Sequence, residues 1–264
     1  MKQVFSASES HNGEDIKVTI ITATFNSEST IIDALTSVRD QSYENVEHLI
    51  IDGASTDATL GLIETFGNPR CWVISSPDSG IYDALNKGLR AATGDIIGVL
   101  HSDDVFAHSD CLANVVALMA GSGADGCYAD LEYVSKNNLS EVFRYWRAGS
   151  FKGRSSLVRG WMPPHPTLFV RSRLRDYCTY NTCYKISADY DLILRLFLNE
   201  NLRFEYLQET LVKMRVGGVS NKNICNILTK MSEDFTIIRA QGVGGVYSLF
   251  LKSARKTCQL THRA

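Results

Sequence analysis

The sequence lacks the features that mark several large classes of protein. It contains no run of about 18 consecutive apolar residues, the length that a membrane-spanning helix needs. Its 27 Lys and Arg side chains are matched by 29 Asp and Glu side chains, which leaves a formal net charge of −2. This balance provides no overall attraction to nucleic acid or to an anionic membrane, so any anionic ligand must be held by a local site.

Cysteine is present without the spacing of a metal site or a disulfide framework. Seven cysteines occur, an odd number, and none forms a Cys-x-x-Cys pair with a matching Cys or His partner. Residues 1–16 are polar where a signal peptide requires an apolar stretch of about 7–15 residues, and we interpret them as a flexible lead-in. We expect a reduced, cytosolic protein.

Common nucleotide-binding and nucleophile motifs are also missing. There is no G-x-x-x-x-G-K-[ST] and no G-x-S-x-G, which argues against a P-loop enzyme and an α/β-hydrolase. GSGADG at 121–126 has the letters of G-x-G-x-x-G, but a predicted helix precedes it and a predicted strand follows it. The dinucleotide fingerprint requires the opposite order, in which the helix N-terminus meets the pyrophosphate.

The first half of the chain alternates short β-branched runs with helical patterns. A helix is expected to begin at Ser29 as its N-cap, with apolar positions at helical spacing after it. The predicted strands are 17–25, 46–52, 71–75 and 95–100, and the further predicted helices are 57–66, 80–91 and 110–120. This alternation predicts an α/β fold with a mostly parallel sheet and right-handed crossovers.

The second half has a different pattern. Its predicted elements are an antiparallel pair formed by CYADLEYV and EVFRYW, a Pro-rich stretch at 161–171, a helix at 189–200, short strands at 203–216 and a helix at 222–240. Residues 243–256 join an apolar cluster to basic residues. That combination indicates either a terminal helix packed on the core or a helix at a membrane surface.

Three carboxylates follow predicted strands of the parallel sheet. Asp52 ends one strand, and Asp103 and Asp104 follow another. Ligands collect beyond the carboxyl ends of parallel strands, and adjacent carboxylates repel each other unless a cation or hydrogen bonds offset the repulsion. Oxygen ligands of this kind suit Mg²⁺ or Mn²⁺. The alternative is that Asp103 or Asp104 caps the helix that follows.

Four segments carry a resemblance to a known family: VTIITATFN, HLIIDGASTDAT, SSPDSGIYDALNKGL and TGDIIGVLHSDD. Together they resemble family 2 glycosyltransferases of the GT-A fold, and they are similar to bacterial enzymes that build capsule, exopolysaccharide or O-antigen. The resemblance implies a Rossmann-like, mostly parallel sheet flanked by helices, with a smaller mixed acceptor-side region and C-terminal helices. The expected segments are the lead-in at 1–16, a nucleotide-sugar-binding half at 17–130, an acceptor-binding and catalytic half at 131–221, and a helical segment at 222–264.

The resemblance implies a set of donor-side residues. They are Thr24, Phe25, Asn26, Asp52, Asp78, Asp83, Asn86, Lys87 and Asp103. Residues 24–26 match the loop on which the nucleotide base packs, and Asp52 matches one of two acidic residues that contact base or ribose. The second acidic residue is replaced by Gly53, which leaves the identity of the base open. Lys87 is alternatively a solvated charge on a helix.

The resemblance also implies a metal site. Residues 101–104 match the family's Asp-x-Asp-Asp segment, with His101 in place of the first Asp. A Mg²⁺ or Mn²⁺ ion is expected at Asp103 or Asp104, where it would stabilise the departing diphosphate.

On the acceptor side the resemblance implies a catalytic base. SADYDLILRL matches the family's Glu-Asp-x-Asp-Leu segment, which makes Asp189 the base and puts Ala188 in place of the usual Glu. Asp191 is expected to point elsewhere, to orient a neighbour or cap the helix. The residues assigned to the acceptor and pyrophosphate are His165, Asp191, Arg215 and Ser220. The alternatives are that Asp189 is an N-cap and that His165 is a packed structural residue.

The implied activity is transfer of a sugar from a nucleoside diphosphate to an acceptor hydroxyl, with inversion at the anomeric carbon. By resemblance the acceptor is a lipid-linked oligosaccharide, which predicts a cytoplasmic enzyme that touches the inner leaflet through its basic C-terminal segment. Two alternatives remain. One is a non-catalytic sugar-nucleotide-binding or assembly subunit of the same fold, and the other is a nucleotidyltransferase, although the loop ATFNSEST lacks the basic residue that the latter needs.

Overall fold

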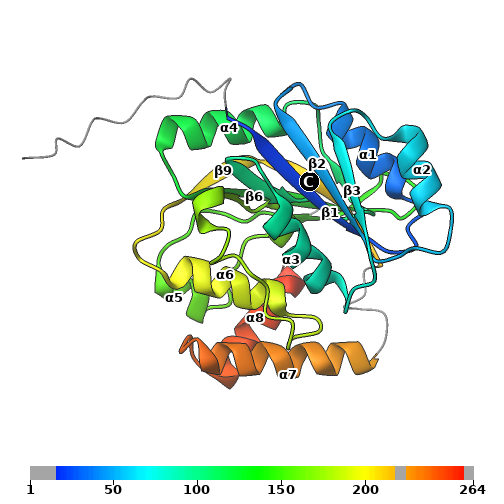
Figure 1. The fold of residues 1–264 in the computed structure, drawn as a ribbon. Coiled ribbons are helices and arrows are strands. Elements are labelled where there is room, and N and C mark those ends of the chain that lie inside the picture. The colour runs from blue at the N-terminus through cyan, green and yellow to red at the C-terminus, as the bar shows by residue number, and fades with distance from the viewer. Residues whose placement is uncertain (1–15, 218–223, 259–264) are drawn as a thin grey trace, which may run out of the picture.

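A single mixed sheet of nine strands organises the protein (Figure 1). The computed structural model describes residues 16–217 and 224–258, so Ser220 and residues 1–15 of the predicted lead-in lie outside the described residues. The strand order is β3-β2-β1-β4-β8-β6-β9-β5, with β7 paired to β6 off this path.

The first half of the chain forms the predicted strand–helix alternation. Its elements are β1 (Val18–Thr24), α1 (Ile31–Arg39), β2 (Val46–Asp52), α2 (Thr59–Phe66), β3 (Cys71–Ser75), α3 (Ile81–Ala91) and β4 (Ile96–Val99). β1 pairs in parallel with β2 and β4, and β2 pairs in parallel with β3. The register places Thr24 opposite Asp52 and Asp52 opposite Ser75, so the carboxyl ends of these strands meet at one edge.

The second half contributes the mixed part of the sheet. Its elements are β5 (Val105–Phe106), α4 (Cys111–Ser122), β6 (Gly126–Val134), β7 (Val142–Trp146), α5 (Arg154–Val158), η2 (His165–Thr167), β8 (Phe169–Arg171), η3 (Ser172–Leu174), α6 (Ala188–Leu198), β9 (Phe204–Arg215), α7 (Ile224–Ala240) and α8 (Val246–Cys258). β6 and β7 are antiparallel, as predicted. The short strands predicted at 203–216 are one 12-residue strand, β9, which pairs in parallel with β6.

β1 is buried on both faces, which explains its unbroken apolar run. Ile20 joins one core cluster, with α4, and Ile21 joins another, with α3 and α6. Successive residues of a strand point to opposite faces, so neighbouring isoleucines serve both clusters. Figure 1 shows α4 on the opposite side of the sheet from α6.

The residues that precede three helices differ from the cap residues considered in the sequence. α1 begins at Ile31 after Thr30, not after Ser29, and Thr30 makes no side-chain cap bond. α4 begins after Asp110, so neither Asp103 nor Asp104 caps it, because β5 lies between them. α6 begins after Ser187, which places Asp189 inside its first turn.

The C-terminal helices close the molecule beneath α6 (Figure 1). Glu233 of α7 accepts hydrogen bonds from the backbone N–H groups of Lys185, Ile186 and Ser187 at 2.8, 3.0 and 2.9 Å. These bonds hold the segment that leads into Asp189. No helix in the described part of the chain combines the length and the apolar character needed to cross a bilayer.

Candidate active site

The loop that follows β1 is locked to the loop that follows β2. Asn26 has a positive φ of 49°, and its Oδ1 accepts the backbone N–H of Thr56 at 2.9 Å. The Asn26 N–H donates to Ser55 Oγ at 2.8 Å. Thr24 is buried, whereas the ring of Phe25 is 61% exposed. The two loops therefore leave the Phe25 ring exposed at the edge of the sheet.

Asp52 is enclosed beneath these loops. Its side chain is fully buried and accepts hydrogen bonds from Ser75 Oγ at 2.6 Å and from the Ser55 N–H at 3.1 Å. The resemblance implied a contact between this carboxylate and base or ribose. In the structure its oxygens bind Ser55 of the loop after β2 and Ser75 at the end of β3.

Asp78 lies where the family's second acidic residue is missing. A Cβ atom on Gly53 would lie 2.7 Å from Asp78 Oδ2 and 3.3 Å from a ring carbon of Phe25. The absence of a side chain at residue 53 therefore lets Asp78 approach the loop. Its Oδ1 accepts the Gly80 N–H at 2.9 Å. The sequence pattern did not reveal this substitution in space, because the two residues belong to different loops.

Two other donor-side residues on α3 lie near the segment before that helix. Lys87 Nζ donates to the carbonyl of Pro77 at 2.8 Å and to Ser76 Oγ at 3.2 Å. Asp83 Oδ2 accepts the Ser79 N–H at 3.1 Å and lies 3.9 Å from Lys87. Lys87 and Asp83 therefore order the segment that carries Asp78.

The two adjacent carboxylates after β4 have different surroundings. Asp103 is partly exposed, whereas Asp104 is 1% exposed and accepts the backbone N–H of Arg215 at 3.3 Å. Burial, and then the charge of Asp103, raise the pKa of Asp104 well above its usual value, which favours its neutral form. Asp103 is therefore the more exposed and less enclosed member of the pair.

Arg215 supports this acidic loop from inside the protein. Its guanidinium donates to the carbonyls of Asp103 at 2.6 Å and Lys136 at 3.1 Å, and it forms an ion pair with Asp33. The side chain is buried, with a relative exposure of 6%. Its donors are thus engaged within the protein, which differs from the pyrophosphate contact that the resemblance implied.

A divalent cation fits this loop only with help from a ligand. Within residues 16–217 and 224–258, no three His, Cys, Asp or Glu side chains are grouped to hold an ion. Mg²⁺ commonly takes one or two carboxylates from the protein and its other oxygens from phosphates and water. Asp103 satisfies that requirement as a single carboxylate.

Two histidines join the acidic loop to the acceptor half. The rings of His101 and His165 are stacked with centroids 6.0 Å apart, and His165 Nε2 is 2.7 Å from the Tyr180 hydroxyl. Burial lowers the pKa of His101, while the nearby charges of Asp103 and Asp189 oppose that effect. His101 therefore lies within reach of a carboxylate from each half of the chain.

The surroundings of Asp189 favour its charged, deprotonated form. Its Oδ1 accepts the Tyr190 N–H at 2.8 Å, and the Tyr82 hydroxyl lies 3.5 Å away. Burial acts to raise the pKa of Asp189, but positive charges, Lys230 foremost, outweigh it and leave the pKa below its usual value. Burial also lowers the pKa of His165 to about 4. At neutral pH the Asp189 carboxylate is therefore charged and the neighbouring His165 imidazole is neutral.

Comparison with known proteins decides the family. A family model described as Glycosyl transferase family 2 matches residues 19–179. The chain is a family 2 glycosyltransferase. It is 30% identical over 207 residues to a PGL/p-HBAD biosynthesis glycosyltransferase of Mycobacterium bovis, which covers 76% of this chain and 78% of that protein.

Solved structures match the glycosyltransferase in fold. TarS of S. aureus in complex with UDP-GlcNAc has a TM-score of 0.67 at 19% identity, over 86% of this chain and 66% of that one. The glycosyltransferase spans 39% of a longer TarS chain. Glucosyl-3-phosphoglycerate synthase of Mycobacterium tuberculosis, solved with Mn²⁺ and UDP, has a TM-score of 0.60 at 16% identity, over 93% and 88% of the two chains. The predicted family and the GT-A fold are confirmed.

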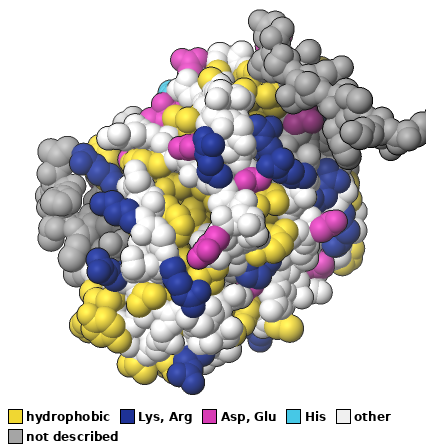
Figure 2. All heavy atoms as spheres, turned by 90° about the vertical axis from the view of Figure 1, so that its left-hand side faces the viewer, with side chains coloured by type: hydrophobic (Ala, Val, Ile, Leu, Met, Phe, Trp, Pro, Cys, Tyr) yellow, Lys and Arg dark blue, Asp and Glu magenta, His cyan; other side chains and the backbone are white. Residues whose placement is uncertain are grey.

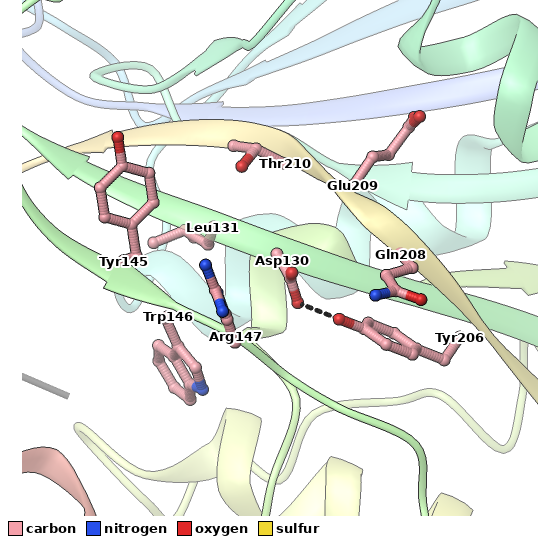
Figure 3. A pocket seen from close by; sticks show the side chains of 9 residues that line it. All are labelled: Asp130, Leu131, Tyr145, Trp146, Arg147, Tyr206, Gln208, Glu209 and Thr210. Atoms are coloured by element: carbon pink, nitrogen blue, oxygen red, sulfur yellow. Dashed lines mark hydrogen bonds between the residues drawn. The ribbon is translucent and has the colours of Figure 1, made fainter. Parts of the chain in front are cut away.

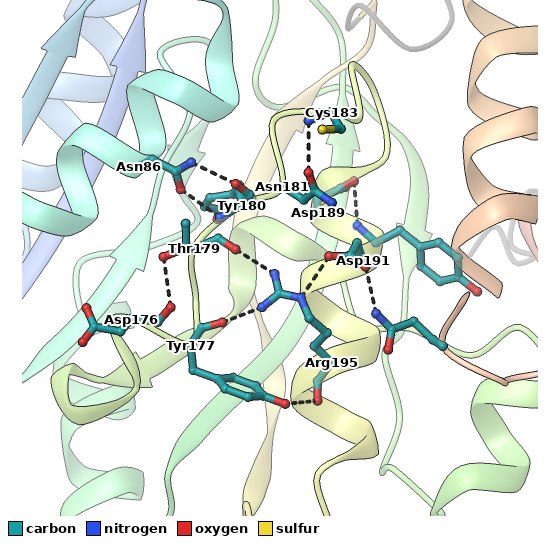
Figure 4. A network of polar contacts seen from close by, with 12 residues as sticks. Asn86, Asp176, Tyr177, Thr179, Tyr180, Asn181, Cys183, Asp189, Asp191 and Arg195 are labelled. Atoms are coloured by element: carbon teal, nitrogen blue, oxygen red, sulfur yellow. Dashed lines mark hydrogen bonds and ion pairs between the residues drawn. The ribbon is translucent and has the colours of Figure 1, made fainter. Parts of the chain in front are cut away.

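Asp191 of the glycosyltransferase lies in a structural network (Figure 4). Its Oδ2 accepts from Arg195 Nε and its Oδ1 from Gln241 Nε2, both at 2.9 Å. Arg195 also donates to the carbonyls of Tyr177 and Thr179 at 2.6 and 2.7 Å. Asp191 therefore orients a neighbour, as expected, and each of its two oxygens accepts a hydrogen bond from within the protein.

The glycosyltransferase has a cavity of about 360 Å³ that no sequence pattern indicates (Figure 3). It lies where the pairing of β6 and β9 shifts register at Asp130, which leaves Gln208 and Glu209 outside the ladder. Asp130 accepts from the Tyr206 hydroxyl and from the Ala148 N–H, both at 2.7 Å. A register shift between strands far apart in sequence leaves no local signal in the chain.

Proposed function

We propose that this glycosyltransferase moves a sugar from a nucleoside diphosphate sugar to an acceptor hydroxyl, with Asp189 as general base. One observation carries the proposal. A donor-side carboxylate, Asp103, and an acceptor-side carboxylate, Asp189, both lie close enough to His101 for their charges to act on its half-buried ring, although they are 86 positions apart. Two carboxylates that meet in one site suit a reaction that must remove a proton and release a diphosphate.

The donor is expected to lie across the edge formed by the first three strands. Phe25 offers an exposed aromatic face for a nucleotide base, and Asp78 offers a carboxylate for base or ribose. UDP-GlcNAc in TarS and UDP in the mycobacterial synthase support a nucleotide-sugar donor for this chain. The assigned residues Thr24, Asn26 and Asp52 act here by shaping the loop.

Asp103 is the residue that would hold a Mg²⁺ or Mn²⁺ ion together with the donor diphosphate. When bound, such an ion neutralises negative charge on the leaving group. Mn²⁺ in two of the similar structures supports this choice of cofactor. Arg215 and Asp104 keep the Asp103 loop in place through the bonds described above.

The chemical step is a direct displacement. The acceptor hydroxyl gives its proton to a carboxylate oxygen of Asp189, its oxygen forms a bond to the anomeric carbon, and the bond to the diphosphate oxygen breaks, which inverts the anomeric centre. A positioned base contributes about 10²–10⁴-fold to the rate. Whole enzymes contribute about 10⁶–10¹⁷-fold, so most of the effect must come from positioning and from electrostatic stabilisation of the diphosphate.

The acceptor class is inferred from the relatives. One is named for PGL/p-HBAD biosynthesis and another for succinoglycan biosynthesis. These names support a role in the biosynthesis of exopolysaccharide or a related glycan. We infer further that the enzyme is cytoplasmic and that its acceptor is a lipid-linked oligosaccharide of a capsule or exopolysaccharide. The four chain segments proposed above, divided near 130 and 221, fit this scheme of a donor half, an acceptor half and a helical end.

A donor screen tests the proposal. The purified chain is incubated with UDP- and GDP-sugars in Mn²⁺, and release of nucleoside diphosphate is measured with and without glycan acceptors. We expect slow release with one donor in water and faster release with a suitable acceptor. Tight binding of a donor with no release under any condition would instead favour the non-catalytic binding subunit.

A further inference from the structure

The outer faces of α7 and α8 carry large apolar side chains that no other element among residues 16–217 and 224–258 covers. On α7 they are Ile227, Leu228, Met231 and Phe235, with exposures of 43, 60, 46 and 36%, and on α8 they are Val246, Tyr247 and Phe250, with exposures of 71, 70 and 67%. We call these seven residues the C-terminal apolar surface. α7 forms the lower edge of the molecule in Figure 1.

The spacing of these residues gives each helix an apolar outer side. The exposed positions of each helix recur three to four residues apart, so they share one side of it. The inner side of α7 presents Ile237 and Ile238 to the core, and the inner side of α8 presents Ser248 and Lys252. Core packing therefore explains the inner sides of these helices and leaves the outer apolar sides without a partner in the described part of the chain.

The carboxylates of α7 bind groups within the protein, and α8 has none among its described residues. The only carboxylates in residues 224–258 are Glu233 and Asp234. Glu233 binds backbone N–H groups of the segment before Asp189, and Asp234 is buried, with Lys252 Nζ 2.7 Å from its Oδ2. Neither carboxylate is available to repel an anionic surface.

Exposed cations border the C-terminal apolar surface. Arg239 is exposed at the end of α7. Arg154, also exposed, donates to the carbonyl of Gly242 in the turn between the helices at 2.7 Å. Exposed Arg159 is also next to α8, because the residue after it, Gly160, packs against that helix. A Cβ atom built on Gly160 would lie 2.9 Å from Lys252 Cβ. Figure 2 shows Lys and Arg side chains beside hydrophobic ones toward this lower end of the molecule.

We propose that the C-terminal apolar surface docks on an anionic lipid bilayer. Aromatic and aliphatic side chains enter the boundary between headgroups and acyl chains, and the bordering Arg side chains pair with anionic headgroups. The protein as a whole is slightly acidic, so the attraction is local. A bilayer accepts side chains that protrude from two neighbouring helices without a matching groove, and the bordering cations favour an anionic partner.

Docking in this way would place the catalytic base near the lipid. α7 is both the helix with the longer apolar side and the helix whose Glu233 holds the backbone before Asp189. The proposal concerns binding alone and does not depend on the sugar-transfer activity.

Vesicle sedimentation of the full chain tests the proposal without any turnover. We expect it to sediment with phosphatidylcholine vesicles that contain phosphatidylglycerol, and to remain in solution with phosphatidylcholine alone or in high salt. The combined substitutions Val246→Ser, Tyr247→Ser and Phe250→Ser, and separately Arg239→Glu, should each reduce the bound fraction about tenfold. Thermal unfolding of each variant checks that it is folded.

Matched controls are available on edge strand β3 and at the residue that precedes it, away from α7 and α8 (Figure 1). Trp72→Ser removes a side chain that is 62% exposed, and Arg70→Glu reverses an exposed charge. Both should sediment like the unaltered protein. Absence of vesicle binding, equal loss in the controls, or a dimer in light scattering that the triple variant converts to a monomer would overturn the proposal, the last in favour of a second copy as the occupant.

Discussion

The side chain of Asn86 forms two hydrogen bonds with the backbone of Tyr180, 94 positions along the chain. Its Nδ2 donates to the Tyr180 carbonyl at 2.9 Å, and its Oδ1 accepts the Tyr180 N–H at 2.8 Å. The Tyr180 hydroxyl in turn lies 2.7 Å from His165 Nε2. Asn86 therefore fixes a donor-side helix to the acceptor half, which differs from the donor contact that the resemblance implied.

The substitution Asn86→Asp tests this link. A carboxylate keeps the size of the amide but loses its donor and faces the Tyr180 carbonyl, so a buried acceptor is left without a partner. We expect the free energy of unfolding to fall by about 1–3 kcal/mol in denaturant titrations at pH 7. Asn137→Asp, the same change at an exposed position, should have little effect. Equal stability of the two variants would contradict the role assigned to Asn86.

Asp189→Asn should separate donor binding from turnover. The amide keeps the shape of the carboxylate but cannot accept the acceptor's proton, so the transfer rate should fall about 10²–10⁴-fold while the dissociation constant of the donor stays nearly unchanged. Steady-state kinetics and calorimetry measure the two quantities. Asp176→Asn makes the same change on an exposed side chain and should transfer normally. Strong transfer by the Asp189 variant would remove that residue from the role of base.

Asp103 and Asp104 are expected to respond differently to removal of their charge. Asp103→Asn should abolish the increase in donor affinity produced by Mn²⁺, because it removes the exposed carboxylate. Asp104→Asn should retain most of that increase, since Asp104 is enclosed and bonded to the Arg215 backbone. EDTA should abolish transfer by the unaltered protein, and Mn²⁺ or Mg²⁺ should restore it. Full activity in EDTA would show that the loop serves another purpose.

Gly53→Ala should disturb the donor edge. The added Cβ would lie 2.7 Å from Asp78 Oδ2, so the carboxylate and the neighbouring Phe25 ring must shift. We expect the dissociation constant of the donor to rise about tenfold, equivalent to about 1.4 kcal/mol. Gly61→Ala is a control, because no atom lies within 4 Å of a Cβ built there. Unchanged binding by the Gly53 variant would mean that Asp78 does not face the donor.

Glu47 should make stability depend on pH in the acid range. Burial acts to raise its pKa, but hydrogen bonds from Thr19 and Thr93 outweigh it and lower the pKa from 4.5 to about 2. A carboxylate with a lowered pKa contributes stability above about pH 4.5 and loses that contribution as the pH falls toward about 2. Glu47→Gln should therefore cost about 2–3 kcal/mol at pH 7 and progressively less below pH 4.5. Denaturant titrations across this range measure the difference, with exposed Glu64→Gln as the control; a penalty that does not shrink in acid would contradict the prediction.

Local patterns were sufficient for the strands and helices of the first half. The runs that became β1 and β2 are buried at every position, and such strands read as continuous apolar stretches. The helix starts were less well predicted, because Ser29 and Thr30 are both plausible caps by residue type, and Thr30, which precedes α1, makes no side-chain cap bond. The split of 203–216 into several strands was wrong, because polar residues at the register shift of β9 interrupt the apolar pattern without ending the strand.

The residues of the candidate site were predictable by type and only partly by role. Asp103 and Asp189 were singled out from sequence, and the structure places both near His101. Asn86 and Arg215 occupy matching positions in the sequence, yet their hydrogen bonds go to protein groups 94 and 112 positions away. A sequence motif records which side chain is present, whereas its available hydrogen bonds depend on what the fold brings against it.

The order of residues along the chain by itself determined the alternation of strands and helices, the family, and the carboxylates at the ends of strands, because each depends on neighbours within a few positions. Only the tertiary structure decided that Asp78 takes the space left by Gly53, that Asp104 is enclosed while Asp103 is partly exposed, and that the other described residues leave the C-terminal apolar surface uncovered. Burial and hydrogen bonding are set by distances in space, and the packing of segments far apart in the chain fixes those distances.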